Sequence, residues 1–126
     1  MDEKAFKDRT KKFALRVIKL VEALPKTKTG EVIGRQLLRS GTSVGANYRA
    51  ACRGKSVADV ISKLGIVEEE ADESRYWMEL LVESELVTEL RLADLMREAD
   101  EIVAMLVASS KTLRARAQAS NLKSKI

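Results

Sequence analysis

Apolar residues recur every three or four positions along most of the chain, which is the spacing of one face of an α-helix. Between residues 6 and 24 they fall on one side of such a helix, and Pro25 followed by the polar segment KTKTG ends this pattern. The periodicity returns from about Glu31 to Cys52, which predicts a second helix. The chain therefore begins with two amphipathic helices joined by a short polar connection.

Two longer periodic stretches follow in the second half of the chain. Ser56 and Asp59 have the spacing of a capping box, so we expect a third helix from about Val57 to about Val87. A fourth helix is expected to begin between residues 88 and 94 and to end at about Arg116. No Gly or Pro marks the turn between these two helices, so that boundary depends on the periodicity alone.

Four amphipathic helices can bury their apolar faces together, and the short connection between the second and the third favours antiparallel neighbours. We therefore expect an all-α fold, an antiparallel up-down-up-down four-helix bundle that forms a single domain over residues 1–126. Hydrophobic residues make up 45% of the chain, which is enough for one packed core. Residues 118–126 are expected to form a flexible tail.

The residue types that the chain lacks argue against several function classes. There is no histidine, which is the commonest general base and transition-metal ligand, and no Gly-rich phosphate loop follows a strand. An acidic cluster lacks the Glu-x-x-His motifs of carboxylate-bridged metal sites in helical bundles. It comprises Glu68, Glu69, Glu70, Asp72 and Glu73, with Glu98 and Glu101 on the next predicted helix. We therefore expect no enzyme activity, no catalytic residues, no metal and no cofactor.

Cysteine usage and hydropathy indicate the compartment. The single cysteine, Cys52, cannot form an internal disulfide, and no apolar run approaches the roughly 18 residues that span a membrane. The N-terminal segment MDEKAFKDRTKK leads into an amphipathic helix rather than a secretion signal. We expect a cytoplasmic protein that has no membrane partner.

Charge is distributed unevenly along the sequence. Residues 1–63 carry 15 Lys/Arg and 6 Asp/Glu, whereas residues 64–110 carry 3 Lys/Arg and 13 Asp/Glu. Residues 111–126 carry 5 Lys/Arg and no acidic residue. Such a chain can bind an anionic polymer with its basic surface, or it can pair its acidic and basic faces within or between subunits.

Four arginines share one face of the second predicted helix, each within about 40° of a common axis. They are Arg35, Arg39, Arg49 and Arg53, and Lys12, Arg16 and Lys19 lie together on the first helix. Because guanidinium groups match phosphate geometry and few aromatic residues accompany them, these seven residues predict backbone contacts to structured RNA or another nucleic acid. The alternatives are a solvated face or salt bridges to the acidic third helix.

Small residues accumulate on the second helix, where Gly41 and Gly45 each cost about 1 kcal/mol of helix stability relative to Ala. Close packing of a neighbouring helix is the most direct way to offset this cost.

On the third helix, Ile66, Trp77 and Leu80 lie roughly opposite the main apolar face. They predict an oligomer interface anchored by Trp77, although a broad core face within one subunit would explain them as well.

Three segments resemble the 23S rRNA intervening-sequence proteins, also called four helix bundle proteins. They are SGTSVGANYRAACRGKS on the second helix, ISKLGIVEEEADESRYWMELL on the third and SSKTLRAR on the fourth. The resemblance implies a four-helix bundle that assembles into a ring-like homo-oligomer, commonly a pentamer, in bacteria. It implies no catalytic residues.

Taken together, these patterns favour a non-enzymatic, oligomeric helical bundle that binds structured RNA or another nucleic acid through its basic surface. The partners would be other copies of the chain, in a pentamer, and a nucleic acid. The alternative is a protein–protein interaction scaffold that binds no nucleic acid.

Overall fold

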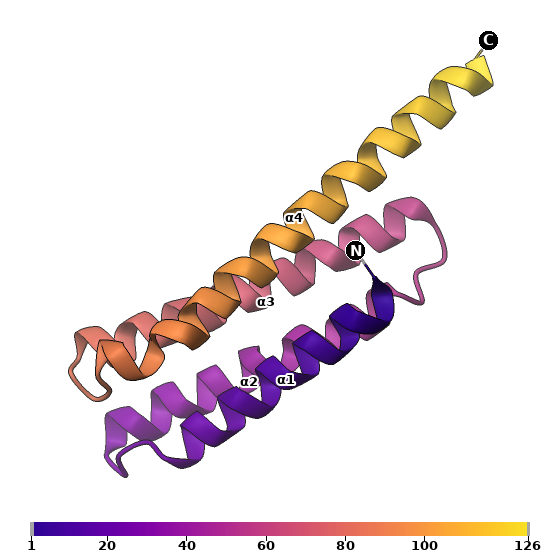
Figure 1. The fold of residues 1–126 in the computed structure, drawn as a ribbon. Coiled ribbons are helices and arrows are strands. Elements are labelled where there is room, and N and C mark those ends of the chain that lie inside the picture. Colours follow the sequence, from indigo (N-terminus) through magenta and orange to yellow (C-terminus); the bar gives the residue numbers. More distant parts are fainter. Residues whose placement is uncertain (1, 126) are drawn as a thin grey trace.

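The computed structural model describes residues 2–125, which form four helices in sequence (Figure 1). They are α1 (Glu3–Glu22), α2 (Lys28–Ala51), α3 (Val57–Glu83) and α4 (Glu89–Lys125). Each helix packs against the next, and α4 returns to α1 along the least closely packed seam. The arrangement confirms the predicted all-α, up-down-up-down bundle. No helix in this part of the chain is both long and apolar enough to cross a membrane.

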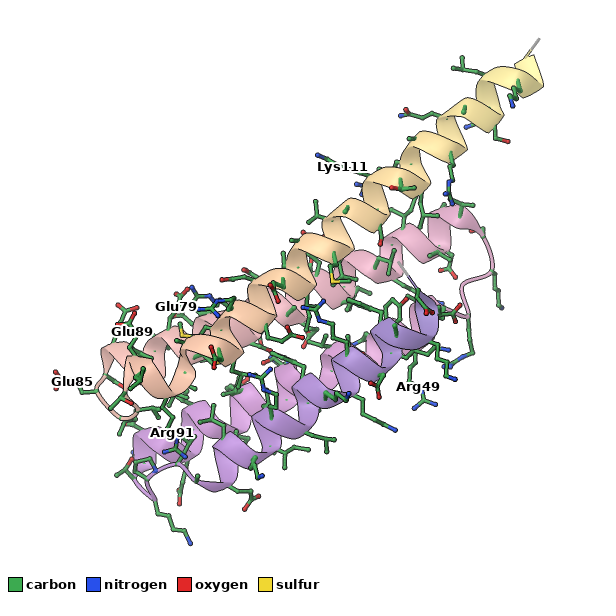
Figure 2. All side chains as sticks on the ribbon, in the orientation of Figure 1. Arg49, Glu79, Glu85, Glu89, Arg91 and Lys111 are labelled. Atoms are coloured by element: carbon green, nitrogen blue, oxygen red, sulfur yellow. The ribbon has the colours of Figure 1, made fainter. Side chains whose placement is uncertain are left out.

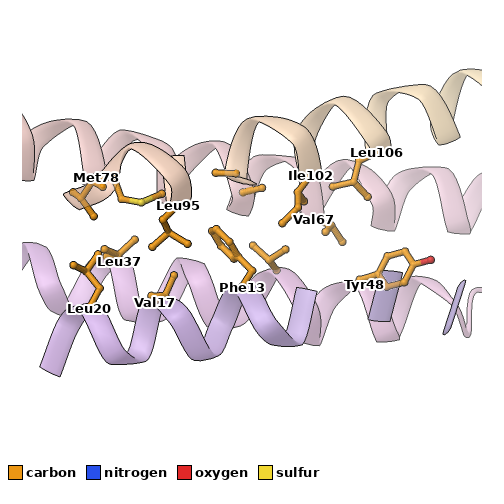
Figure 3. Packing of buried hydrophobic residues seen from close by; sticks show 14 of the residues in the cluster. Phe13, Val17, Leu20, Leu37, Tyr48, Val67, Met78, Leu95, Ile102 and Leu106 are labelled. Carbon is orange, nitrogen blue, oxygen red and sulfur yellow. The ribbon is translucent and has the colours of Figure 1, made fainter. Parts of the chain in front are cut away.

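The core runs along the axis between all four helices (Figure 3). Each helix contributes residues at the predicted three- and four-residue spacing, among them Phe13 and Val17 of α1, Leu37 of α2 and Ile102 of α4, all fully buried. Burying side chains of this size stabilises the fold by about 1.5–3 kcal/mol each. Because the buried side chains come from every helix, the four faces depend on one another for burial.

Glycines on α2 allow α1 to approach closely. A Cβ added at Gly41 would lie 2.8 Å from Val17 Cγ1, and one at Gly45 would lie 3.3 Å from Thr10 Oγ1. The buried Thr10 hydroxyl donates back to the Phe6 carbonyl oxygen at 3.0 Å, so its polar atom is satisfied inside the interface. The small residues of α2 therefore serve close helix packing, as predicted.

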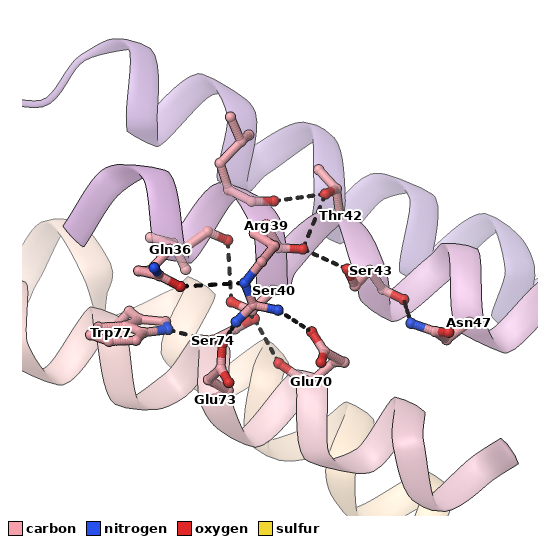
Figure 4. Close-up of polar contacts among 12 residues, drawn as sticks. Gln36, Arg39, Ser40, Thr42, Ser43, Asn47, Glu70, Glu73, Ser74 and Trp77 are labelled. Atoms are coloured by element: carbon pink, nitrogen blue, oxygen red, sulfur yellow. Dashed lines mark hydrogen bonds and ion pairs between the residues drawn. The ribbon is translucent and has the colours of Figure 1, made fainter. Parts of the chain in front are cut away.

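The other flank of α2 meets α3 through a pair of buried serines (Figure 4). The Ser74 hydroxyl lies 2.9 Å from the Ser40 hydroxyl, and Ser40 also donates to its own helix at the Leu37 carbonyl. Both side chains are fully buried. Small hydroxyl residues let these two helices pack closely without an unsatisfied polar group.

The helix ends show where the sequence-based boundaries hold and where they fail. Ser56 caps α3 as predicted, since its hydroxyl accepts from the Asp59 N–H at 3.0 Å. However, α3 ends at Glu83 rather than Val87. The stop is a Schellman motif, in which the Leu86 N–H reaches the Leu81 carbonyl and Glu85 adopts a φ of 64°. Glycine usually occupies that position, so the sequence carries no signal for it.

The C-terminal boundary of α4 is also different from the prediction. The sequence predicts a helix end at about Arg116, but the helix continues without a break to Lys125. Residue 126 of the expected tail (118–126) lies outside the described residues. The last turns of α4 extend past the other three helices (Figure 1). The Ala- and Lys-rich composition of this segment supports helix without requiring a buried face.

Candidate nucleic-acid interface

The predicted arginines of α2 lie in different surroundings. Arg35 and Arg49 are exposed, and Arg53, which lies just past the helix, is exposed as well. Arg39 instead bends onto α3 (Figure 4), where its guanidinium contacts Glu70 at 3.3 Å and also pairs with Glu73. For Arg39, therefore, the structure shows the predicted alternative, which is a salt bridge to the acidic helix α3.

The predicted cations of α1 lie on the side of that helix away from α2. Lys12 pairs with Asp8 on its own helix at 3.1 Å. Arg16 and Lys19 line a hollow of about 250 Å³ with Arg91 of α4. The structure therefore does not gather the seven predicted residues into one surface.

A groove between α1 and α2 is lined by cations from both helices. It has a volume of about 470 Å³. Four cationic residues line it, namely Lys4, Lys7, Lys11 and Arg49. Its other lining residues are Ala14, Thr42, Gly45 and Ala46, together with one carboxylate, Asp8. The small side chains leave the groove open between its charged walls.

Local structure explains why these charges face one another. Lys4, Lys7 and Lys11 follow the i, i+3, i+7 spacing and therefore share one side of α1. Gly45 packs against Thr10, which holds α2 close beside that side of α1 and brings Arg49 to the same groove. The lysine spacing is visible in the sequence, but only the packing of the two helices shows that it joins Arg49.

Three of these four cations have no ion-pair partner among residues 2–125. Lys7 pairs with Glu3 at 3.1 Å, an exposed contact one helical turn apart that contributes well under about 1 kcal/mol. No carboxylate in residues 2–125 forms an ion pair with Lys4, Lys11 or Arg49. The groove can therefore accept phosphate groups without first breaking strong internal pairs.

A polar cluster that the sequence did not indicate joins α1 to α4. Arg9 donates two hydrogen bonds of 2.8 Å to Glu98 and one of 2.8 Å to Glu101. The hydrogen bonds from Arg9 hold the pKa of Glu98 below its ordinary value, and the same bonds raise the pKa of Arg9. Both carboxylates are thus engaged by an arginine, and residues 2–125 hold no group of three or more potential metal ligands.

A cavity of about 360 Å³ lies at the end of the bundle that adjoins the α1–α2 groove. Glu3, Tyr48, Cys52 and Arg116 are among its lining residues. Burial raises the pKa of the Cys52 thiol and the pKa of the Tyr48 hydroxyl. A raised thiol pKa disfavours the thiolate, the form in which cysteine acts as a nucleophile.

The predicted interface residues on α3 are only partly available to another subunit. Ile66 is 45% exposed, whereas Trp77 and Leu80 are half-buried and pack against the core. The Trp77 indole N–H donates to Glu73 at 3.2 Å, and its ring meets the exposed Tyr76 edge-on. Ile66 and Tyr76 are therefore the apolar side chains of this face that solvent reaches most.

Comparison with known proteins agrees with this architecture. The family model described as 23S rRNA-intervening sequence protein matches residues 3–108, which includes the second and third helical signatures but ends before SSKTLRAR. A crystal structure is also similar, that of a protein of unknown function from the S23 ribosomal protein family of Bacteroides thetaiotaomicron VPI-5482. It is 38% identical with a TM-score of 0.82, and the match covers 88% of this chain and 99% of that one.

No curated protein matches the chain. The matched family model covers most of the bundle, and the similar crystal structure shares both its fold and more than a third of its aligned residues. The chain therefore belongs to the 23S rRNA-intervening sequence protein family.

Proposed function

We propose that this protein is a non-enzymatic, cytoplasmic helical bundle that assembles with copies of itself and binds structured RNA or a similar nucleic acid. The observation that carries the proposal is the α1–α2 groove, in which Lys4, Lys11 and Arg49 lack carboxylate partners among the described residues. Exposed, unpaired cations gain binding free energy by neutralising phosphates and releasing their counterions.

The proposed mechanism is recognition of the phosphate backbone rather than of base edges. Lysine and arginine donors positioned along a groove fix the register of a nucleic acid but carry little sequence information. No aromatic side chain lines the groove within the described residues, so base stacking has no platform there. Structured RNA, which proteins read largely by shape and backbone, fits such a surface.

The direct test is fluorescence anisotropy with a fluorescein-labelled hairpin fragment of 23S rRNA, titrated over a series of salt concentrations. We expect binding whose logarithmic association constant falls linearly and steeply with the logarithm of salt concentration. An absence of binding even at low salt would reject the proposal. A labelled DNA hairpin of the same sequence, measured in parallel, distinguishes RNA from general nucleic-acid binding.

A second candidate, a protein–protein scaffold without nucleic-acid binding, is favoured by the contacts of α3. Arg39 pairs with the acidic helix, and Ile66 and Tyr76 leave apolar surface in solvent. Light scattering over a salt series separates the driving forces of assembly. Dissociation at high salt would support charge pairing between subunits, whereas persistence at high salt and loss in Ile66→Asp would support apolar contact.

We also propose that the assembly is a ring of five copies held through the α3 face that carries Ile66, Trp77 and Leu80. Trp is enriched at the energetic centres of interfaces, and the half-buried ring of Trp77 leaves part of its area available. Light scattering that gave the mass of one 14.0 kDa chain at every concentration would reject assembly.

A further inference from the structure

The end of α4 is unlike the rest of the bundle. From Arg114 to Lys123 every residue is exposed except Ala117, which is half-buried. These residues extend beyond the other three helices (Figure 1). From Ile102 onward the chain has no acidic residue, whereas Lys111, Arg114, Arg116 and Lys123 are all cationic. We call residues 114–125 the C-terminal arm.

The arm has no apolar face that would dock it on a protein surface. The face that continues the core stripe of α4 past Leu113 carries Ala117 and Ser120, and the one large apolar residue, Leu122, projects elsewhere. Apart from Leu122, the exposed side chains of residues 114–123 are small, polar or cationic. This chemistry suits an anionic partner rather than an apolar one.

The arm leaves the bundle at the same end as the basic groove. Arg116 lines the end cavity together with Glu3, and Glu3 pairs with Lys7 of the groove. Arg53 and Lys55 follow α2 in the adjoining connection. Figure 2 shows Arg49 and Lys111 toward this half of the molecule, with Glu85 and Glu89 at the opposite end.

We infer that the C-terminal arm is a second phosphate-binding element, which extends along the backbone of the same nucleic acid that occupies the α1–α2 groove. This inference rests on the proposed function and adds a second contact to it. At 1.5 Å per residue the arm is about 18 Å long, a length over which a duplex presents about ten phosphate charges. No carboxylate of residues 2–125 pairs with Arg114, Arg116 or Lys123.

The family model matches the bundle and does not extend over the arm. The family model ends at residue 108, before the arm begins. The groove lies within the matched residues and the arm outside them. The arm would therefore extend a binding surface that the bundle already provides, and lengthen its footprint on the nucleic acid.

The test compares three full-length forms by anisotropy on the fluorescein-labelled 23S rRNA hairpin over a salt series. The arm variant carries Arg114→Gln, Arg116→Gln and Lys123→Gln, and a neutral control carries Gln118→Ala and Asn121→Ala. The salt slope is the slope of the logarithm of the association constant against the logarithm of salt concentration. We expect its magnitude to be smaller by about 2 to 3 in the arm variant and to equal the wild-type value in the control. Amide hydrogen exchange of residues 114–123 should slow when the hairpin binds.

The outcomes separate this inference from the proposal on which it rests. An arm variant that binds with the wild-type slope, while the hairpin leaves exchange of the arm unchanged, would overturn the role of the arm and leave the groove as the binding site. Failure of the wild-type protein to bind the hairpin at low salt would overturn both. Thermal melting of the arm variant should match the wild type, because the three substituted side chains are exposed and lie outside the core.

Discussion

Arg9 of α1 and Glu98 of α4 form a two-point ion pair, with Nε to Oε2 and Nη2 to Oε1 distances of 2.8 Å. The pair crosses the least closely packed seam of the bundle, and the Glu98 side chain is only 15% exposed. Bidentate geometry and partial burial distinguish it from the exposed pairs that lie one turn apart on single helices. We therefore assign to it a larger role in holding the first helix to the last.

Arg9→Gln should lower the free energy of unfolding by about 1–3 kcal/mol at pH 7, because it leaves Glu98 partly buried without its cationic partner. Urea denaturation followed by circular dichroism measures this change. Arg97→Gln is the matched control, since Arg97 is 69% exposed and forms an ion pair with Asp94, on its own helix, at 3.5 Å. It should alter stability by less than about 0.5 kcal/mol, and an equal loss in both variants would contradict the assignment.

The same pair predicts a pH dependence with a definite sign. Since Arg9 lowers the pKa of Glu98 in the folded state, the stabilisation is present above the ordinary glutamate pKa and is lost as pH falls through the lowered folded pKa. The stability difference between wild type and Arg9→Gln should therefore shrink below about pH 4. Urea midpoints measured from pH 7 to pH 3 would contradict this if the difference stayed constant.

One substitution made at two glycines should have opposite effects on stability. A Cβ at Gly41 would lie 2.8 Å and 2.9 Å from the two methyl groups of Val17, so Gly41→Ala should destabilise the fold by about 1–3 kcal/mol. Gly65 lies within α3, and a Cβ added there would meet no neighbouring group within 4 Å. Gly65→Ala should therefore stabilise by about 0.5–1 kcal/mol through helix propensity. Thermal melting of the two variants checks both signs.

The turn between α3 and α4 should be improved by a glycine. Glu85 holds a φ of 64°, which an L-residue with a long side chain adopts at a cost and glycine adopts freely. Glu85→Gly should stabilise the protein by about 0.5–1 kcal/mol in denaturant unfolding. Glu83→Gly, two residues earlier and still helical, should instead destabilise by about the propensity difference. A loss in both variants would argue against strain at Glu85.

Most of the fold followed from periodicity, and the exceptions have physical causes. The start of α3 and its cap were predictable because Ser56 and Asp59 interact locally. The end of α3 was not, because Glu85 takes a conformation that sequence patterns assign to glycine. The continuation of α4 to Lys125 was missed because its last turns lack the apolar spacing on which the helix predictions relied.

The candidate site was predictable only in part. Projection of α2 placed Arg35 and Arg49 on an exposed face, as observed, but could not show that Arg39 would meet Glu70 on α3. Projection of α1 singled out Lys12, Arg16 and Lys19, whereas the lysines that join Arg49 lie on another side of the same helix. Which side faced α2 depended on how the glycines of α2 pack against Thr10 and Val17, which a single helix does not reveal.

The central claim is that the α1–α2 groove binds the phosphate backbone. It is tested most directly by replacing Lys4, Lys11 and Arg49 with Gln and comparing salt slopes on the 23S rRNA hairpin. The matched control replaces Lys26, Lys28 and Arg97 with Gln, which removes the same charge from exposed positions outside the groove.

Because each lost phosphate contact reduces the slope by a little under one, the groove variant should show a slope smaller by about 2 to 3, while the control stays near the wild type. Equal slopes for the groove variant and the wild type, or equal losses in the groove variant and the control, would contradict the claim.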